Sequence, residues 1–379
     1  MTLTSQRHEF DIPEDVAYLN CAYLGPLSRP TCDVGVGAVA RKARPWEITV
    51  PDFFEPLTRA REAFARLVGG DAAGVAIIPS ASYGLATAAA NLPVEAGQEI
   101  VVLADQFPSN VYVWRDLAAR TGAVVRTVER PHDLDWTAAL EEVIGERTAI
   151  VAVGNCHWTD GTLIDVARVG KAAAAVGAAL VVDAAQSLGA LPFDVGACSP
   201  AFVVGVAYKW LLGPYSVAFM WVAPQWRGGR PLELNWITRA GSEDFAGLVG
   251  YTDELHAGAR RYDVGEPSNF ALLPTAIAAM DQILEWDPAE IAAYAAGLTD
   301  RVADRADELS LAVAPRDLRS SHLLGVRVAG ADAVRLAGGL REAGVHVSVR
   351  GDAIRVSAHV FNTEADVDRL FDALPPLLP

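Results

Sequence analysis

The sequence predicts an α/β protein in which a large unit with a mostly parallel sheet precedes a smaller α+β unit. Over roughly the first 225 residues, short β-rich runs alternate with Ala-rich segments of helical character, which is the pattern of repeated strand–helix units. Several of these runs are almost entirely apolar, as expected for strands that helices cover on both faces. Beyond about residue 310 the order becomes strand, helix, two short strands and helix.

The elements can be assigned in chain order. Strands of the large sheet are expected at 75–78, 100–103, 123–128, 149–153, 179–182, 202–206 and 217–222, with helices at 82–91, 111–120, 134–144 and 165–176. The segment 227–261 lacks clear periodicity and is interpreted as a long excursion, a feature that is often functional. A helix is expected at 271–285, followed by strands at 322–328, 345–349 and 353–356 and helices at 332–343 and 364–374.

A chain of 379 residues is long enough for two domains. We expect a large domain over residues 30–270. The N-terminal segment 1–29 is expected to cross back and pack with residues 271–379 in the small domain.

Composition excludes several classes of protein. The net charge is −16, which argues against nucleic-acid binding because phosphate backbones recruit basic surfaces. The N-terminus lacks the apolar core of a signal peptide, and the longest apolar run, 172–182, is too short to span a membrane. The four cysteines, Cys21, Cys32, Cys156 and Cys198, show no metal-ligand spacing. They fit free thiols in the cytoplasm better than disulfides or a metal site.

Two charged residues follow neighbouring apolar runs. Asp183 ends the run 179–182 and Lys209 comes shortly after 202–206. Ligands of open α/β sheets bind outside the carboxyl ends of strands. A lysine in apolar surroundings has a lowered pKa and can form a Schiff base, whereas a buried aspartate can hold a protonated pyridine nitrogen. Both residues equally fit structural roles, as a helix-capping carboxylate and a solvated surface charge.

The combination of Asp183-Ala-Ala-Gln186 with Tyr208-Lys209 and Gly213-Pro214 resembles the class V aminotransferase superfamily of pyridoxal 5′-phosphate (PLP) enzymes of fold type I. That superfamily includes cysteine desulfurases, selenocysteine lyases, kynureninases and isopenicillin N epimerase-like proteins. The resemblance implies PLP as cofactor, with Lys209 as the Schiff-base lysine. It implies that Asp183 pairs with the ring nitrogen and Gln186 hydrogen-bonds the phenolic oxygen. Tyr208 is implied to contact the phosphate.

Further motifs extend the resemblance to the rest of the cofactor. The strand–turn–helix stretch containing Ser80, Ala81 and Ser82 matches the segment that cups the phosphate, and helix N-termini suit anions. Phe107, in Phe-Pro-Ser, resembles the aromatic residue that stacks on the PLP ring in kynureninases. Each stretch also fits an ordinary role, a helix N-cap or a core aromatic.

Two later stretches supply candidates for the substrate side. His157, Trp158 and Thr159 follow the strand 149–153, and Thr159 is assigned to the cofactor in an uncertain register. Arg355 matches the arginine that binds the substrate α-carboxylate in related enzymes, and a guanidinium fork fits a carboxylate well. A surface salt bridge is the alternative for Arg355.

The resemblance also implies a homodimer with active sites at the interface. Relatives place Gly-Thr-Pro where this chain has Gly265-Glu266-Pro267, and an anionic Glu266 disfavours a phosphate contact. Ser268 or Arg261 is the expected substitute.

The leading prediction is an aminotransferase-like enzyme acting on an amino acid or amine. A β-lyase (C–S lyase-like) or an amino-acid epimerase on the same scaffold is the alternative, and a non-catalytic PLP-fold binding protein is a further one. Cysteine desulfurase activity is disfavoured because the stretch 344–352 contains no cysteine. The substrate pocket is expected to include aromatic and arginine side chains, namely Trp46, Trp236, Arg239 and Tyr251.

Overall fold

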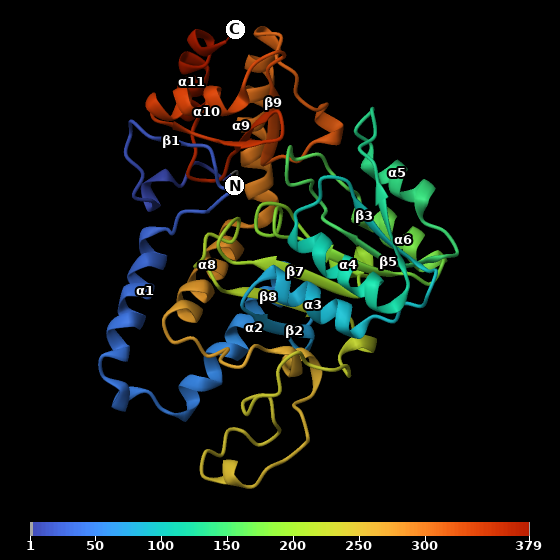
Figure 1. Ribbon diagram of the computed structural model, residues 1–379. Helices are drawn as coiled ribbons and strands as arrows, with labels where there is room; N and C mark the ends of the chain where they lie inside the picture. The colour runs from blue at the N-terminus through green and yellow to red at the C-terminus, as the bar shows by residue number, and fades with distance from the viewer. Residues whose placement is uncertain (1–2, 379) are drawn as a thin grey trace.

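A seven-stranded sheet forms the centre of residues 3–378, the part of the chain that the computed structural model describes (Figure 1). Its strand order is β2-β8-β7-β6-β5-β3-β4, and β8 alone runs antiparallel to its neighbours. The predicted mostly parallel sheet is therefore confirmed, and the other strands all end at one edge. The strands are β2 (Val75–Ile78), β3 (Glu99–Leu103), β4 (Val124–Val128), β5 (Thr148–Val153), β6 (Ala179–Asp183), β7 (Phe202–Val206) and β8 (Ala218–Val222).

Helices cover both faces of the sheet, so its strands are buried on both sides. Along β7, Val203 faces one apolar cluster while Phe202 and Val204 face the other, as the two-residue period of a strand requires. The flanking helices are α2 (Glu55–Leu67), α3 (Ala81–Asn91), α4 (Ser109–Thr121), α5 (Trp136–Val143), α6 (Val166–Ala175) and the short α7 (Val195–Cys198).

Glycine at position 84 allows α3 to lie unusually close to the sheet. A Cβ atom at Gly84 would stand 2.8 Å from side-chain atoms of both Ile78 and Val204. Ser80 caps the helix, its hydroxyl accepting a hydrogen bond from the Tyr83 amide at 3.2 Å. The N-terminus of α3 is thus held at the edge where the parallel strands end.

The C-terminal part forms a second layer above this edge (Figure 1). Its antiparallel sheet has the order β11-β12-β9. The predicted strand 345–349 is wrong in one respect, because the chain divides there: β10 pairs with the N-terminal β1, whereas β11 pairs with β12. The elements are β1 (Ala17–Tyr18), β9 (Leu323–Arg327), α10 (Ala333–Glu342), β10 (Val345–His346), β11 (Ser348–Arg350), β12 (Ala353–Ser357) and α11 (Glu364–Ala373).

Three long helices complete the chain, α1 (Arg29–Lys42), α8 (Leu272–Trp286) and α9 (Pro288–Glu308). α8 packs against both α1 and α2, and the division into domains 30–270 and 1–29 with 271–379 stays a prediction. The excursion 227–261 extends from the foot of the molecule in Figure 1. Within residues 3–378, no helix is long and apolar enough to cross a membrane. No cluster of three or more His, Cys, Asp or Glu side chains in that range is arranged to hold a metal ion.

One buried ion pair ties the end of the excursion to the sheet, and it provides a test of this architecture. Arg61 of α2 donates to Asp263 (Nη1 to Oδ1, 3.0 Å), which also accepts the Ile77 amide at 2.8 Å. Arg61→Leu leaves a buried carboxylate without its partner, so the free energy of unfolding should fall by about 3–5 kcal/mol. Chemical denaturation measures the loss. Arg59→Leu breaks the exposed pair with Asp281 and should cost less than about 1 kcal/mol; equal losses would contradict the assignment.

Candidate active site

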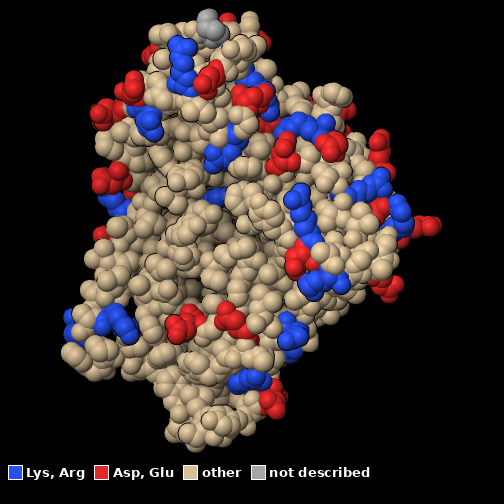
Figure 2. All heavy atoms as spheres, viewed as in Figure 1, with Lys and Arg blue, Asp and Glu red and all other residues tan. Residues whose placement is uncertain are grey.

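The carboxyl edge of the large sheet carries a cavity of about 460 Å³. The loops after β3, β5, β6 and β7 all reach it, since these strands end at the same edge. The N-terminal segment and the C-terminal sheet close it from above, and Figure 2 shows a hollow in this region of the surface. Its lining residues are Ala22, Tyr23, Leu24, Phe107, Trp158, Gln186, Tyr208, Lys209, Tyr215, Arg350 and Arg355.

Lys209 is buried in this cavity, with a side chain that is 7% exposed. Its Nζ lies 5.5 Å from the ring centroid of Phe107 and 5.6 Å from that of Tyr208. Burial lowers the pKa of Lys209 to about 8; the charge of Asp183 opposes this shift and those of Arg355 and Arg350 add to it. A substantial fraction of this amine is therefore neutral near physiological pH.

Asp183 ends β6 beside the strand that leads to Lys209, because Asp183 pairs with Val204 of β7. Its Oδ1 accepts the Ala185 amide at 3.1 Å. The carboxylate keeps some open surface, but protein surrounds it deeply enough that burial raises its pKa, against the opposing effects of the Ala185 amide and the Lys209 charge. A cationic group placed beside it would be strongly favoured in such surroundings.

The orientation of the Gln186 side chain is determined by its neighbours. Trp210 donates its indole N–H to Oε1 at 3.1 Å, and Nε2 donates to the Ala22 carbonyl at 3.2 Å. An indole N–H is only a donor, so the amide oxygen must face Trp210. Gln186 can therefore present only an N–H to the cavity.

Two histidines of the C-terminal part hold this region from behind. His322 Nε2 lies 2.6 Å from the Gln186 carbonyl oxygen and His359 Nε2 lies 3.2 Å from that of Trp210. Burial lowers the pKa of His322 to about 4 and that of His359 to about 3. Both are therefore neutral near physiological pH, and each donates Nε2–H to a carbonyl that accepts it.

An aromatic pair forms one wall of the cavity. The ring of Phe107 meets that of Trp158 edge-on, with centroids 5.3 Å apart. Trp158 is itself held by a hydrogen bond from Nε1 to the Asp105 carbonyl at 2.5 Å. The Phe107 ring thus stands as a supported apolar surface near Lys209 Nζ.

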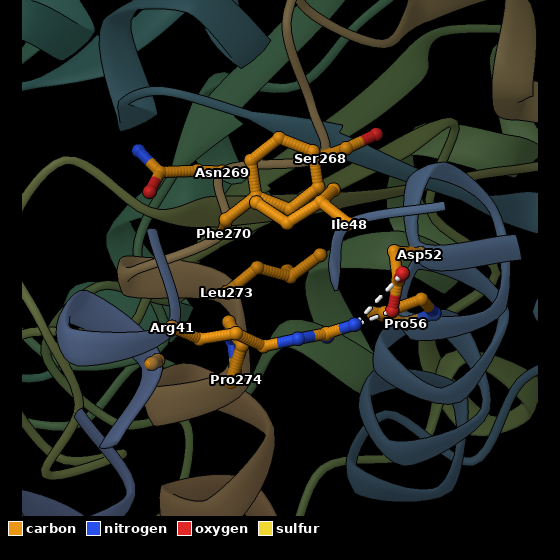
Figure 3. A pocket seen from close by; sticks show the side chains of 10 residues that line it. Arg41, Ile48, Asp52, Pro56, Ser268, Asn269, Phe270, Leu273 and Pro274 are labelled. Atoms are coloured by element: carbon orange, nitrogen blue, oxygen red, sulfur yellow. Dashed lines mark hydrogen bonds and ion pairs between the residues drawn. The ribbon is translucent and has the colours of Figure 1, made fainter. Parts of the chain in front are cut away.

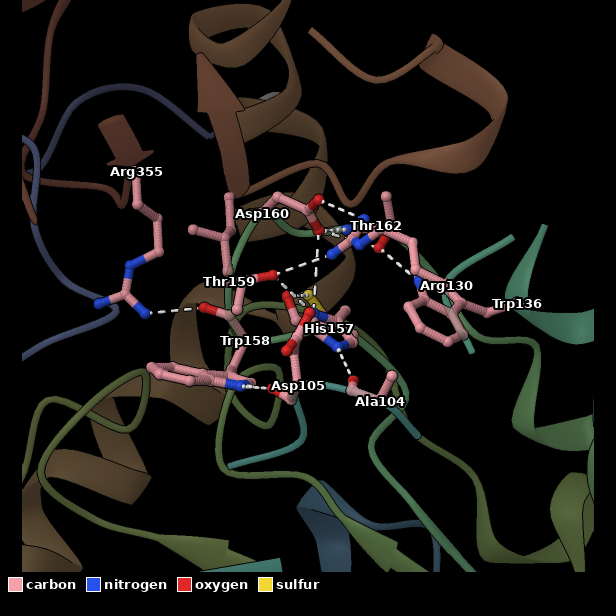
Figure 4. Close-up of polar contacts among 12 residues, drawn as sticks. Ala104, Asp105, Arg130, Trp136, His157, Trp158, Thr159, Asp160, Thr162 and Arg355 are labelled. Carbon is pink, nitrogen blue, oxygen red and sulfur yellow. Dashed lines mark hydrogen bonds and ion pairs between the residues drawn. The ribbon is translucent and has the colours of Figure 1, made fainter. Parts of the chain in front are cut away.

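Arg355 is 1% exposed and is only partly hydrogen-bonded. Its Nε donates to Ser348 Oγ at 3.1 Å. Its Nη1 donates to the Trp158 carbonyl at 2.8 Å, a contact drawn in Figure 4. Nη2 is buried and has no hydrogen-bond partner among the described residues. A buried donor of this kind is costly unless a ligand accepts from it, and Arg355 lines the cavity where such a ligand would bind.

Thr159 lies elsewhere, contrary to the expected register. Its hydroxyl contacts His157 Nδ1 at 2.7 Å and accepts from Arg130 at 3.1 Å (Figure 4). His157 is also occupied, because its Nε2–H donates to the Ala104 carbonyl and its ring stacks on Trp136. These side chains brace the loop, and Trp158 is the residue of the stretch that reaches the Lys209 cavity.

Ser80, Ala81 and Ser82 are not among the residues that line the Lys209 cavity, but they lie at the same sheet edge. They begin α3, and the hydroxyls of Ser80 and Ser82 are 2.9 Å apart. A helix start with two hydroxyl groups is a suitable position for a phosphate.

No residue of the Gly265-Glu266-Pro267 stretch lines the Lys209 cavity; Gly265 and Glu266 line another hollow. Ser268 donates its hydroxyl to the Phe53 carbonyl at 2.6 Å, so that group is already used. Ser268 also lines a small cavity of about 40 Å³ between α1, α2 and α8, where Arg41 is paired with Asp52 (Figure 3).

The four side chains expected in the substrate pocket, one at position 46 and three in the excursion, do not line the Lys209 cavity. Trp236 and Tyr251 line other hollows, and Trp46 is 76% exposed. Arg239 donates to the Asp253 carbonyl at 2.8 Å. The expectation that they form the substrate pocket is not supported.

Sequence reasoning missed three contributions to the site. Trp210 directly follows Lys209, and Arg350 lies in the stretch 344–352, whose lack of cysteine was its only noted feature. Residues 22–24, in the N-terminal segment, also line the cavity, and no role was assigned to them from the sequence. The only sequence signal for these residues was that they lie close to recognised motifs. Each reaches the site through tertiary contacts, which the local sequence does not reveal.

A buried lysine beside a carboxylate, an oriented amide and an aromatic wall at the end of a parallel sheet defines a PLP-binding site of fold type I. The residues present fit PLP. Asp183 suits a protonated ring nitrogen and Gln186 offers an N–H donor to the cavity. Arg355 has a hydrogen-bond donor, Nη2, that no described residue uses. The comparisons agree. The sequence model "Aminotransferase class-V" matches residues 50–370, and the chain belongs to this family of PLP-dependent enzymes.

The similar proteins carry several activities. The chain is 29% identical to isopenicillin N epimerase from Streptomyces clavuligerus over 96% of this chain and 95% of the relative. It is 31% identical to kynureninase from Deinococcus radiodurans over 71% of this chain and 66% of the relative. Among solved structures, C-DES with glycine linked to its PLP cofactor gives a TM-score of 0.88 at 18% identity, covering 98% of this chain and 99% of that one. Apo cysteine desulfurase from Thermococcus onnurineus gives a TM-score of 0.84 at 20% identity, covering 98% of this chain and 97% of that one.

The lowered pKa of Lys209 predicts how the apoprotein should react with PLP. An amine of pKa about 8 is roughly one-tenth neutral at pH 7, against about one part in 2500 for an exposed lysine. The rate of Schiff-base formation, followed by absorbance, should rise with pH and level off above about pH 8.

Two variants test the sign of the neighbouring charges. Asp183→Asn removes a charge that raises the pKa of Lys209, so the midpoint of the pH dependence of Schiff-base formation should move to lower pH. Arg355→Gln removes a charge that lowers it, so the midpoint should rise. A wild-type midpoint near 10.5 would contradict the burial argument.

Proposed function

We propose that this enzyme is aminotransferase-like, acting on an amino acid or amine, with PLP attached as a Schiff base at Lys209. One observation carries the proposal. Among the described residues that line the cavity, Lys209 is the basic group whose pKa, at about 8, lies near neutrality. The single amine is thus suited to move a proton between two positions on the same side of a bound substrate.

The residues that would hold PLP follow from their positions. Asp183 would face the ring nitrogen, Phe107 the ring and Gln186 the phenolic oxygen. Ser80, Ala81 and Ser82 would receive the phosphate at the start of α3. Tyr208 is proposed as a further phosphate contact. Thr159 is not retained in the proposal, because its hydroxyl is bound to His157 and Arg130.

The chemistry follows from these positions. Bound PLP supplies an electron sink that stabilises negative charge at the substrate Cα. Lys209, as a neutral amine, takes the Cα proton and holds it at Nζ. Arg355 Nη2, which lacks a hydrogen-bond partner among the described residues, orients the substrate by donating a hydrogen bond to its carboxylate. Phe107 and Trp158 exclude water from one side, and the negative charge of Asp183 keeps a proton on the nitrogen that faces it.

An epimerase is the second candidate, supported by 29% identity to isopenicillin N epimerase over almost the full length of both chains. Epimerisation with two groups would need an acid opposite Lys209. Tyr208 also lines the cavity, but burial raises its phenol pKa to about 12, which makes it a weak acid for that role. A β-lyase remains the third candidate, and a non-catalytic binding protein is disfavoured by the complete site.

The three buried cysteines of this chain are poorly suited to forming a persulfide. Burial raises the pKa of Cys21 and Cys198, and it raises that of Cys156 to about 12. Such thiols hold their protons and are poor nucleophiles. The stretch 344–352 contains no cysteine and forms part of the C-terminal sheets.

A homodimer is proposed because apolar side chains are exposed along α1 and the excursion. They include Val36 at 64%, Leu234 at 73% and Val249 at 85% exposure. Figure 2 shows the foot of the molecule as mostly uncharged surface, with a few Lys, Arg, Asp and Glu side chains above it. Patches of this kind mark protein interfaces. The four unpaired cysteines support a cytoplasmic location.

The reaction type is tested by incubating the holoenzyme with a panel of L-amino acids. The expected products are a keto acid and pyridoxamine phosphate in equal amounts, measured by chromatography. Lys209→Ala should abolish both products, whereas Lys171→Ala, at an exposed lysine, should leave them unchanged. Ammonia without pyridoxamine phosphate would indicate a lyase, and D-isomer without keto acid would indicate an epimerase.

The orientation of Gln186 gives a second test. Trp210→Phe keeps the ring but removes the donor that fixes the amide, so the amide can turn its oxygen to the cavity. A lost hydrogen bond to the phenolic oxygen should raise the pH midpoint of the visible band of bound PLP, because donors stabilise the anionic form.

Trp114→Phe is the matched control, since Trp114 is also buried and donates to Asn110 at 2.8 Å. Both variants should lose about 1–3 kcal/mol of stability. Only Trp210→Phe should move the midpoint; an unchanged midpoint would refute the role given to Trp210.

A further inference from the structure

Three arginines share one face of the C-terminal sheet. In the pairing register, Ser348 lies opposite Arg355, Arg350 opposite Ala353, and Ala353 opposite Arg327. Paired residues point to the same side of a sheet and alternate residues along a strand do likewise. Arg327, Arg350 and Arg355 therefore all point to one side, where the large unit lies.

Only one of the three arginines is neutralised. Arg327 pairs with Asp160 at 3.1 Å and with Asp352 at 3.0 Å. Within residues 3–378, no carboxylate oxygen lies within 4.0 Å of a guanidinium nitrogen of Arg350 or Arg355. Unpaired charges are costly to bury, and two of them on one cavity indicate that anionic ligand groups are missing.

Arg350 is held in place but is not saturated. Its Nη1 donates to the Val349 carbonyl at 2.6 Å, and its guanidinium lies over the Trp158 ring, 5.3 Å from the centroid. Its Nε is buried and has no hydrogen-bond partner among the described residues. The side chain thus has a defined position and unused donors.

Arg350 lines two neighbouring spaces. Together with Trp158 it lines both the Lys209 cavity and a neighbouring hollow of about 770 Å³, which we call the outer groove. A substrate whose α-carboxylate is held by Arg355 would extend its side chain past Trp158 toward Arg350.

We propose that Arg350 binds a second carboxylate, at the end of the substrate side chain, and that the enzyme prefers amino acids with two carboxylates. The proposal rests on the proposed function in that Arg355 holds the α-carboxylate. It assigns Arg350 as a specificity-determining residue. The outer groove leaves room for chains longer than the shortest dicarboxylic amino acids.

Binding of probes without an amino group tests this directly. Glutarate and butyrate are titrated calorimetrically into the holoenzyme, into Arg350→Gln and into the control Arg341→Gln, an exposed arginine on α10. Glutarate should bind about 10- to 100-fold more tightly than butyrate in the wild type and in the control. In Arg350→Gln this difference should shrink to within about threefold, with butyrate binding unchanged.

Two results would overturn the proposal. Equal affinities in the wild type would show that no second carboxylate is recognised. An equal loss for butyrate and glutarate in Arg350→Gln would show that Arg350 serves the same carboxylate as Arg355.

The proposed reaction is judged separately. The probes cannot react at Lys209, so a glutarate preference that depends on Arg350 stands even if L-glutamate yields no keto acid and no pyridoxamine phosphate. In that event the aminotransferase reading fails and the carboxylate site remains. If L-glutamate does react, L-glutamine should bind about tenfold or more weakly, and Arg350→Gln should remove that preference.

Discussion

The adjacency of β6 and β7 in one parallel sheet is the constraint on which the site depends. Asp183 pairs with Val204, so the residues that follow the two strands emerge side by side at the same edge. An anionic and a basic group, both largely removed from water, then share one cavity and influence each other's pKa. Burial raises the pKa of Asp183 and lowers that of Lys209, and because the two groups share one cavity the charge of each opposes the shift of the other.

The C-terminal part completes a site that the large sheet only begins. Its three-stranded sheet brings Arg355 and Arg350 over the carboxyl edge, and His322 and His359 bind the backbone of Gln186 and Trp210 from behind. The N-terminal segment joins the same assembly, since Gly25 donates to the Tyr208 carbonyl at 2.9 Å. A Cβ at Gly25 would come within 2.1 Å of the Lys209 carbonyl oxygen, so this segment packs directly on the lysine loop.

The strands of the large sheet were the most predictable elements. The predicted bounds 75–78 and 202–206 agree with β2 and β7, because a strand buried on both faces must be a short apolar run. Helices α1, α2 and α9 were not assigned. In α1 only Thr31 is buried, so it has no apolar periodicity to read. The division of the predicted strand 345–349 was not anticipated. One half, β10, pairs with β1, more than 300 residues away, whereas the other, β11, pairs with β12 a few residues later.

The sequence by itself determined the strands of the large sheet, the family and the Asp183, Gln186 and Lys209 set, because these depend on local hydrophobic pattern and on closely spaced motifs. Tertiary structure decided which candidates meet. It placed Thr159 against Arg130, turned the Gln186 amide toward Trp210 and left Arg350 without a carboxylate. Those outcomes depend on contacts between segments far apart in the chain, and local pattern contains no information about which distant side chain will satisfy a given hydrogen bond or charge.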